Sequence, residues 1–258
     1  MAKQRVLVTG GAGRIGTMVR TALQDDYDVR ALDLRAIDGV ESFVADMTDY
    51  EAIRPAFEGV DIVVDLANNP SGSLSWDLAY ANNIPATFNA LRAAHEAGVK
   101  RVVFTSSNRA AQGYELDEPY ASICRGTYDG LQPGKFPLVT TSMPVRPSGP
   151  YGIAKCLGEA AARYFSDNFG MSCICLRPGT VHGGDKPTDI RQYATLFTPN
   201  DLKGLYRAAV AAPDGLRYGT YFGVSRNTWR FWDISDAKRD LGYEPQDDAE
   251  VWRGKIDV

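Results

Sequence analysis

The fold is decided by the stretch RVLVTGGAGRIG at residues 5–16, where an apolar, β-branched run passes directly into a glycine-rich turn. The run over residues 5–9 predicts a strand, and the amphipathic segment that continues to about Leu23 predicts a helix. Glycines at positions 10, 13 and 16 permit a tight turn, close approach to a pyrophosphate and packing of the helix on the strand. Free amides at the start of that helix would attract anionic oxygens. The order strand, glycine turn, helix therefore predicts a dinucleotide-binding unit.

The β-α-β pattern repeats along the chain after this first unit. Further strands are predicted at residues 28–32, 41–45, 61–66, 101–105, 172–176 and 220–224, and helices at 48–57, 78–97, 150–169 and 199–212. Apolar strands that alternate with helices indicate a parallel sheet buried on both faces. We expect an α/β fold, a Rossmann-type doubly wound parallel sheet. Residues 1–180 would form the dinucleotide-binding domain with the catalytic residues, and 181–258 a small carboxyl-terminal substrate-binding region of the same compact unit.

Asp33 follows the second predicted strand and lies 20 residues after Gly13. A dinucleotide fold places an acidic residue at this distance to bind the adenosine ribose hydroxyls. Its carboxylate would repel a 2′-phosphate, so NAD is favoured over NADP. Arg35 would reverse this preference if it turned inward, and the alternative reading of Asp33 is a polar loop residue.

Tyr151 and Lys155 stand four residues apart at the start of the predicted helix over residues 150–169, so they share one face of it. A tyrosine with an ordinary pKa near 10 is a poor base, and a neighbouring ammonium stabilises its phenolate. Tyr151 would then accept a hydroxyl proton during hydride removal. Such a pair also arises by chance on amphipathic helices, so the interpretation depends on the motifs around it.

Composition excludes several other classes of protein. The formal net charge of −4 and the hydrophobic content of 44% are those of a globular protein without an electrostatic reason to bind nucleic acid or a membrane. The first residues lead straight into a strand, which favours a cytoplasmic location. The histidines, His95 and His182, are too few for a histidine-based metal cluster, and the four cysteines are expected to be reduced thiols.

Residues 113–149 are rich in Pro, Gly, Ser and Thr, and predict an ordered excursion that covers a site.

Taken together, the glycine turn, Asp33, the pair Ser106-Ser107 at a strand end and the Tyr151/Lys155 pair resemble the extended short-chain dehydrogenases/reductases of the NAD-dependent epimerase/dehydratase family. The segment 241–245, LGYEP, is similar to that family's carboxyl-terminal signature. The resemblance implies that Ser107 orients the substrate hydroxyl and Tyr151 is the base. It also implies that Lys155 binds the nicotinamide ribose and lowers the pKa of Tyr151.

The same resemblance assigns two sets of binding residues. The expected NAD-binding residues, besides Tyr151 and Lys155, are Gly10, Gly13, Arg14, Ile15, Gly16, Asp33, Leu34, Asp46, Met47, Leu66, Ala67, Asn68, Asn83, Thr105, Ser106 and Pro178. The expected substrate-binding residues are Ser107, Asn108, Arg109, Thr180 and Arg191.

Within the family the chain most resembles the uronate dehydrogenases, through residues 106–108, 151–159, 194–212 and 231–233. That likeness implies oxidation of the ring C1 hydroxyl of a sugar acid to a lactone, with Arg191 paired to the substrate carboxylate. A solvated surface charge is the alternative for Arg191. Arg109 replaces a histidine of those enzymes, and the excursion over 113–149 is longer than theirs, which leaves the choice of sugar open.

Three functions follow from these observations. The leading one is an NAD-dependent dehydrogenase of a sugar or sugar acid, with a sugar-phosphate dehydrogenase as a variant of it. The second is a sugar epimerase or dehydratase that retains its NAD, and the third a non-catalytic nucleotide-sensing protein. A small sugar substrate, no metal, no nucleic acid or membrane partner, and a homo-oligomer are expected.

Overall fold

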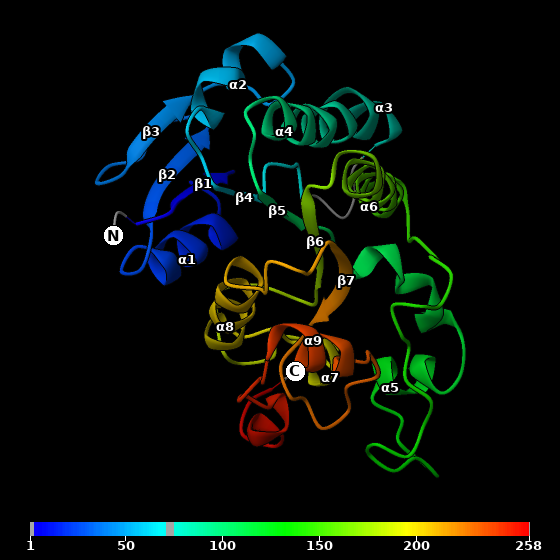
Figure 1. Ribbon diagram of the computed structural model, residues 1–258. Coiled ribbons are helices and arrows are strands. Elements are labelled where there is room, and N and C mark those ends of the chain that lie inside the picture. The colour runs from blue at the N-terminus through cyan, green and yellow to red at the C-terminus, as the bar shows by residue number, and fades with distance from the viewer. Residues whose placement is uncertain (1–2, 71–74, 258) are drawn as a thin grey trace.

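A parallel sheet of seven strands forms the centre of the protein, in the order β3-β2-β1-β4-β5-β6-β7 (Figure 1). The computed structural model describes residues 3–70 and 75–257. The strands are β1 (Arg5–Thr9), β2 (Asp28–Asp33), β3 (Glu41–Val44), β4 (Ile62–Asp65), β5 (Arg101–Thr105), β6 (Ser172–Pro178) and β7 (Tyr218–Gly223). The direction in which strands are added reverses between β1 and β4, and ligands of open α/β sheets bind at such a point. The predicted Rossmann-type fold is confirmed.

Helices cover both faces of this sheet. They are α1 (Arg14–Leu23), α2 (Tyr50–Phe57), α3 (Trp76–Leu78), α4 (Ile84–Glu96), α5 (Tyr120–Arg125), α6 (Pro150–Phe169), α7 (Gln192–Thr195), α8 (Pro199–Val210) and α9 (Ser235–Leu241). Helices α2, α4 and α6 bury one core with the sheet, and α1 and α8 bury a second on the opposite face (Figure 1). Both faces of the strands are therefore apolar, as expected for a parallel sheet.

The helix predicted as one element over residues 78–97 is divided. A π-helical turn, Ala79–Asn83, separates α3 from α4, and within it the amide of Ile84 donates to the carbonyl oxygen of Ala79, five residues earlier. Pro85 explains the break, because its ring nitrogen has no proton to continue the α-helical ladder. The turn places its asparagines beside the end of β4.

The predicted excursion over residues 113–149 is ordered. It contains the 3-10 helix Gln112–Leu116 and α5, and it lies away from α1 and the first strands, on the side of β6 and β7 (Figure 1). Its apolar side chains form a third core with residues beyond β7, which include Phe231 and Trp232. The amide of Val139 donates to the carbonyl oxygen of Phe231 at 2.8 Å, which ties the two segments together.

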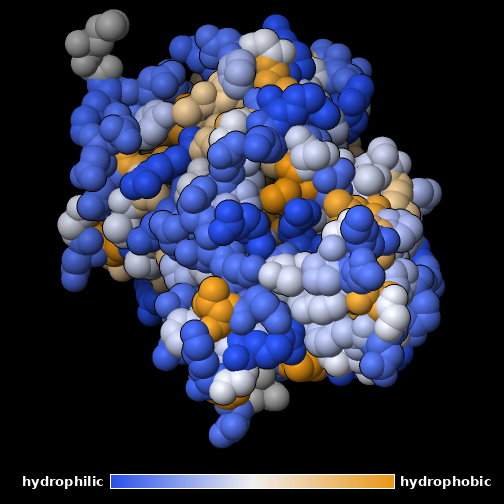
Figure 2. All heavy atoms as spheres, turned by 90° about the horizontal axis from the view of Figure 1, so that it is seen from below, coloured by the Kyte–Doolittle hydropathy of each residue, from blue (hydrophilic) through white to orange (hydrophobic). Residues whose placement is uncertain are grey.

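Residues after 180 contribute to two layers of the protein. Helix α8 and strand β7 complete the sheet and its α1 face, whereas α7, α9 and the 3-10 helix Ala249–Trp252 form the outer part. The face that carries these outer elements is mostly hydrophilic, with hydrophobic residues in small separate groups (Figure 2). In the part of the chain that the structure describes, no helix has the length and apolar character needed to span a bilayer.

Candidate active site

The glycine turn between β1 and α1 forms a cradle with little space for side chains. Gly10 has a φ of +62°, which favours glycine. A Cβ on Gly16 would lie 2.3 Å from the carbonyl oxygen of Gly10, so the helix can approach the turn this closely only without a side chain. Both constraints are those of a turn that brings backbone amides against a phosphate.

Asp33 ends β2 beside this turn and is already bonded to it. One carboxylate oxygen accepts from the amide of Ala12 at 2.9 Å, and the other accepts from the amide of Leu34 at 2.8 Å. The guanidinium of Arg35 donates to the carbonyl oxygen of Ala12 at 3.2 Å. The carboxylate thus faces the groove and also fixes the turn, while Arg35 lies at its rim.

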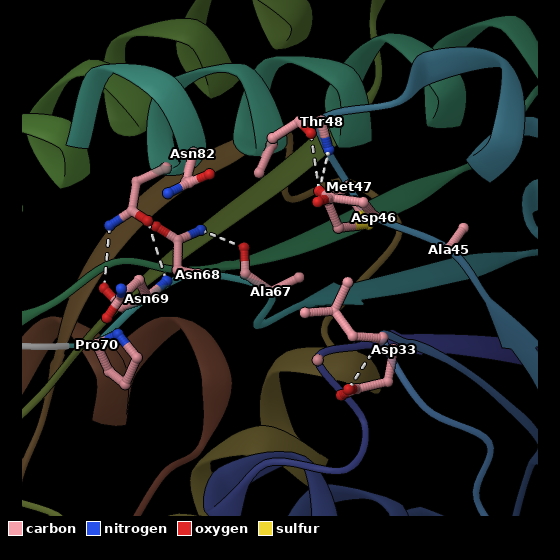
Figure 3. Close-up of a pocket in the computed structure, with 14 residues that line it drawn as sticks. Asp33, Ala45, Asp46, Met47, Thr48, Ala67, Asn68, Asn69, Pro70 and Asn82 are labelled. Atoms are coloured by element: carbon pink, nitrogen blue, oxygen red, sulfur yellow. Dashed lines mark hydrogen bonds between the residues drawn. The ribbon is translucent and has the colours of Figure 1, made fainter. Parts of the chain in front are cut away.

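Two adjoining cavities, of about 410 and 670 Å³, run along the carboxyl edge of the sheet from β2 to α6. They share Gly10, Asp33 and Asn68, so they form one groove. In the first cavity, Asp33 lies on one side and Asn68 and Asn82 lie across from it (Figure 3). The second extends past the glycine turn to Tyr151 and Lys155. An elongated dinucleotide fits this shape, with its adenosine near Asp33 and its nicotinamide near Tyr151.

Most of the residues expected to bind NAD line this groove. Those that do are Gly10, Gly13, Arg14, Ile15, Gly16, Asp33, Leu34, Asp46, Met47, Leu66, Ala67, Asn68, Asn83, Thr105, Tyr151 and Lys155. Ser106 and Pro178 are not among the residues that line it, and the Ser106 hydroxyl instead donates to Glu159 at 2.5 Å. Asn83 fastens the groove wall, because its side-chain amide exchanges two hydrogen bonds with the backbone of Asn69.

Helix α6 positions Tyr151 and Lys155 at the deep end of the groove. The helix begins at Pro150, a favourable first residue because amides in the first turn have no partner within the helix. The Lys155 ammonium, on a residue that is 2% exposed, lies 5.6 Å from the centre of the Tyr151 ring. It donates to the backbone oxygen of Thr105 at 2.6 Å. The predicted proximity of the two groups is confirmed.

Burial dominates the electrostatics of these two groups. Burial raises the pKa of Tyr151 to about 12, and the effects that oppose the rise are hydrogen bonding by Ser107 and the charge of Arg109. Burial also lowers the pKa of Lys155 to about 8, against the attraction of Asp65 and Glu159. The nearby charge of Arg109 thus favours the phenolate form of Tyr151.

The end of β5 supplies the polar groups next to Tyr151. Ser107 and Asn108 are both buried, and the Ser107 hydroxyl accepts from the amide of Arg109 at 3.2 Å. The Arg109 side chain is half-buried and has no ion pair among the described residues. A hydroxyl held by Ser107 and Tyr151 would therefore lie close to a free guanidinium.

Thr180 and Arg191, expected from the sequence to bind substrate, are brought together beyond the end of β6. The Arg191 guanidinium donates to the Thr180 hydroxyl at 3.0 Å. It also makes a bidentate pair with Glu115, at 2.6 and 2.7 Å. The sequence reading missed Glu115, which lies in the excursion, 76 residues away from Arg191.

A buried ion pair and a buried carboxylate behind the site were also missed. Glu159, one turn after Lys155 on α6, forms a buried bidentate pair with Arg177 of β6 at 2.7 and 2.8 Å. Asp65 at the end of β4 is 1% exposed and accepts from the Thr9 hydroxyl at 2.6 Å. The available signal was a charge at the end of an otherwise apolar run, as in the run IVVD at residues 62–65.

Comparison with known proteins agrees with this geometry. The model of the NAD dependent epimerase/dehydratase family matches residues 6–204. Two curated relatives from Haloferax volcanii are each 33% identical over 95% of this chain. They are an NAD-dependent glucose-6-phosphate dehydrogenase, covered over 94% of its length, and an L-arabinose 1-dehydrogenase (NAD(P)(+)), covered over 97%.

A solved structure gives the same result. The uronate dehydrogenase of Agrobacterium tumefaciens, crystallised as a variant in complex with NAD, has a TM-score of 0.82 and 30% identity. The match covers 99% of this chain and 89% of that enzyme. The chain therefore belongs to the NAD-dependent epimerase/dehydratase family, as an enzyme of the extended short-chain dehydrogenase/reductase type related to the NAD-dependent sugar dehydrogenases.

Proposed function

We propose that this protein oxidises the ring C1 hydroxyl of a sugar with NAD and releases the lactone. The observation that carries the proposal is the placement of Ser107, Tyr151 and Lys155 at the deep end of a groove shaped for a dinucleotide. Relatives that are named as dehydrogenases of arabinose, glucose 6-phosphate and uronates support a sugar as substrate.

Ser107 and Tyr151 act directly on the reacting hydroxyl. Ser107 orients the C1 hydroxyl, and Tyr151 as the phenolate accepts its proton while the C1–O bond becomes a carbonyl. The cationic Arg109 favours this phenolate. Lys155 is held by Thr105 so that its ammonium lies beneath the Tyr151 ring and within reach of a ribose hydroxyl.

The groove fits NAD by its own structure. The turn at Gly10, Gly13 and Gly16 is closed to side chains but open to a pyrophosphate, and the Asp33 carboxylate provides acceptors for ribose hydroxyls. NAD, when bound there, supplies the acceptor for the hydride that leaves C1. The residues that line the groove would hold it, with the adenosine against Asp46 and Met47.

The remaining parts of the proposal concern the substrate region and the assembly. We assign residues 1–180 to NAD binding and catalysis and 181–258 chiefly to the substrate, which Asn108, Arg109, Thr180 and Arg191 would contact. The free thiols of all four cysteines favour a reducing compartment such as the cytoplasm.

Exposed apolar side chains on the neighbouring helices α4 and α6, among them Phe88 and Tyr164, favour a homo-oligomer.

A substrate panel tests the proposed reaction. Aldoses, uronates and sugar phosphates are supplied with NAD, and the absorbance of NADH is followed together with the lactone product. We expect NADH to accumulate in proportion to the lactone with at least one neutral sugar or sugar acid. Conversion of a sugar to its epimer or dehydrated product without net NADH would contradict the proposal and favour an enzyme that retains its NAD.

A further inference from the structure

The pairing of Arg191 with Glu115 bears on the class of sugar that the site accepts. Two parallel hydrogen bonds of 2.6 and 2.7 Å join the guanidinium to the carboxylate, the strongest geometry that this pair can adopt. Both side chains are largely shielded from water, with 24% of Arg191 and 10% of Glu115 exposed. Burial lowers the pKa of Arg191, but the hydrogen bonds and charge of Glu115 offset this effect, so the pKa is raised overall. The carboxylate of Glu115 therefore balances the positive charge of Arg191 within the protein.

Several contacts place this pair next to the reacting groups. Gln112, which precedes Glu115 by three residues, donates to its carboxylate at 3.4 Å and accepts from the Ser148 hydroxyl at 2.6 Å. The amide of Ser148 donates to the carbonyl oxygen of Arg109, the residue that acts on Tyr151. On the other side, Arg191 bonds Thr180, which precedes Val181 in the groove wall. The pair is thus linked to the backbone of Arg109 through Gln112 and Ser148, and to the segment that enters the groove wall through Thr180.

We propose that Glu115 makes this enzyme select a neutral sugar over the corresponding sugar acid, because it occupies the guanidinium that a substrate carboxylate would use. This inference rests on the proposed oxidation at C1 and replaces the expectation that Arg191 grips a substrate anion. A uronate would have to displace Glu115 or bring its carboxylate beside a second one, and like charges placed together in a partly dry site are strongly unfavourable.

A neutral sugar faces no such conflict. Its hydroxyl groups both donate and accept, so one hydroxyl can donate to a free lone pair of Glu115 while another accepts from Arg191. Thr180 and Thr195 already make neutral contacts of this kind with the guanidinium, at 3.0 and 3.3 Å. The paired charges therefore form a hydrogen-bonding surface suited to a polyhydroxylated carbon chain.

Galactose and galacturonate form the test pair, because they differ in the group on C5 and share the reacting C1. We expect the wild type to have a kcat/KM for galactose at least about ten times that for galacturonate. Glu115→Gln should raise the ratio of galacturonate to galactose by about 30-fold or more, since Arg191 then keeps an unmatched charge. Glu118→Gln is the matched control, because it breaks the exposed pair with Arg125 in the same excursion and should leave the ratio unchanged.

The double variant Glu115→Gln/Arg191→Gln assigns the effect to the guanidinium, and in it the gain for galacturonate should be lost. Binding of both sugars to the complex with NADH, measured by calorimetry, gives a readout that does not require turnover. A panel without any NADH formation refutes the proposed oxidation, and the binding ratios then still decide the inference. Wild-type preference for galacturonate, or no gain of galacturonate by Glu115→Gln, would overturn the role of Glu115 and leave the dehydrogenase assignment standing.

Discussion

Replacement of Asp65 by asparagine should make the protein more stable at neutral and alkaline pH. Asp65 lies at the end of β4, where it is 1% exposed and one carboxylate oxygen accepts from the Thr9 hydroxyl at 2.6 Å. Burial raises the pKa of Asp65 from its ordinary value of 3.8 to about 6, although Thr9 and Lys155 oppose the rise. Keeping this buried carboxylate ionised therefore destabilises the folded state. Asparagine carries no charge and removes this penalty, and its side-chain oxygen can still accept from Thr9.

The size of this effect follows from the pKa difference between the folded and unfolded states. A rise from 3.8 to about 6 is about two pKa units, and at about 1.4 kcal/mol for each unit the penalty is roughly 3 kcal/mol. The folded state binds the proton more tightly, so the penalty is absent below pH 3.8, grows between the two values and is complete above about pH 6. We expect Asp65→Asn to raise the free energy of unfolding by roughly 3 kcal/mol at pH 8.

Urea unfolding of the wild type and of Asp65→Asn at pH 8 and at pH 4.5 measures this difference. The gain should shrink strongly at the lower pH, where the folded wild type also carries a proton on Asp65. Asp61, directly before the start of the same strand, is the control with the opposite sign, because the amide of Arg5 lowers its pKa. A gain of zero at pH 8, or one that does not change with pH, would refute the reasoning and show that Lys155 compensates the carboxylate fully.

Four further predictions concern the site and the assembly. Tyr151→Phe should abolish turnover and leave NAD binding intact, as NADH formation and calorimetry would show, and near-normal activity would exclude Tyr151 as the base. Asp33→Ala should weaken the binding of NAD by about 10- to 100-fold and reduce the preference for NAD over NADP, measured as KM for each cofactor. An unchanged preference would place Asp33 outside the ribose site. Arg109→Gln should shift the rise of kcat/KM to higher pH, because loss of a nearby cation raises the pKa of Tyr151, and a superimposable pH profile would contradict this. Tyr164→Glu, at a side chain that is 53% exposed on α6, should convert an oligomer into monomers in sedimentation, with Arg163→Glu as a charged control; equal sedimentation of both variants and the wild type would exclude this face.

The parts of the site predicted from sequence are those that a single turn or strand end determines. The glycine turn and Asp33 lie where the spacing predicted, because a parallel strand followed by a helix always brings these positions to the same edge of the sheet. Tyr151 and Lys155 meet for a similar reason, since four residues make about one helical turn. Periodicity failed at the π-helical turn Ala79–Asn83, where Pro85 interrupts a pattern that otherwise reads as one continuous helix.

Ion pairs between residues that are distant in the sequence could not be predicted from it. Arg177 and Glu159 form a buried pair because α6 packs against β6, and no spacing in the printed chain links the two residues. The pKa of Tyr151 likewise depends on burial and on Arg109, which comes from another segment 42 positions earlier in the numbering. The effect expected of Lys155 on that pKa stays a prediction.

The sequence by itself determined the sheet, the glycine turn and the proximity of Tyr151 and Lys155, because their geometry depends on backbone hydrogen bonds and on residues a few positions apart. Only the tertiary structure decided which distant charged side chains pair with one another. Glu115 reaches Arg191 across 76 residues, and a contact of that separation leaves no periodic trace in the chain. It forms because the excursion and the segment after β6 are packed against the same third core, which holds the two charges together.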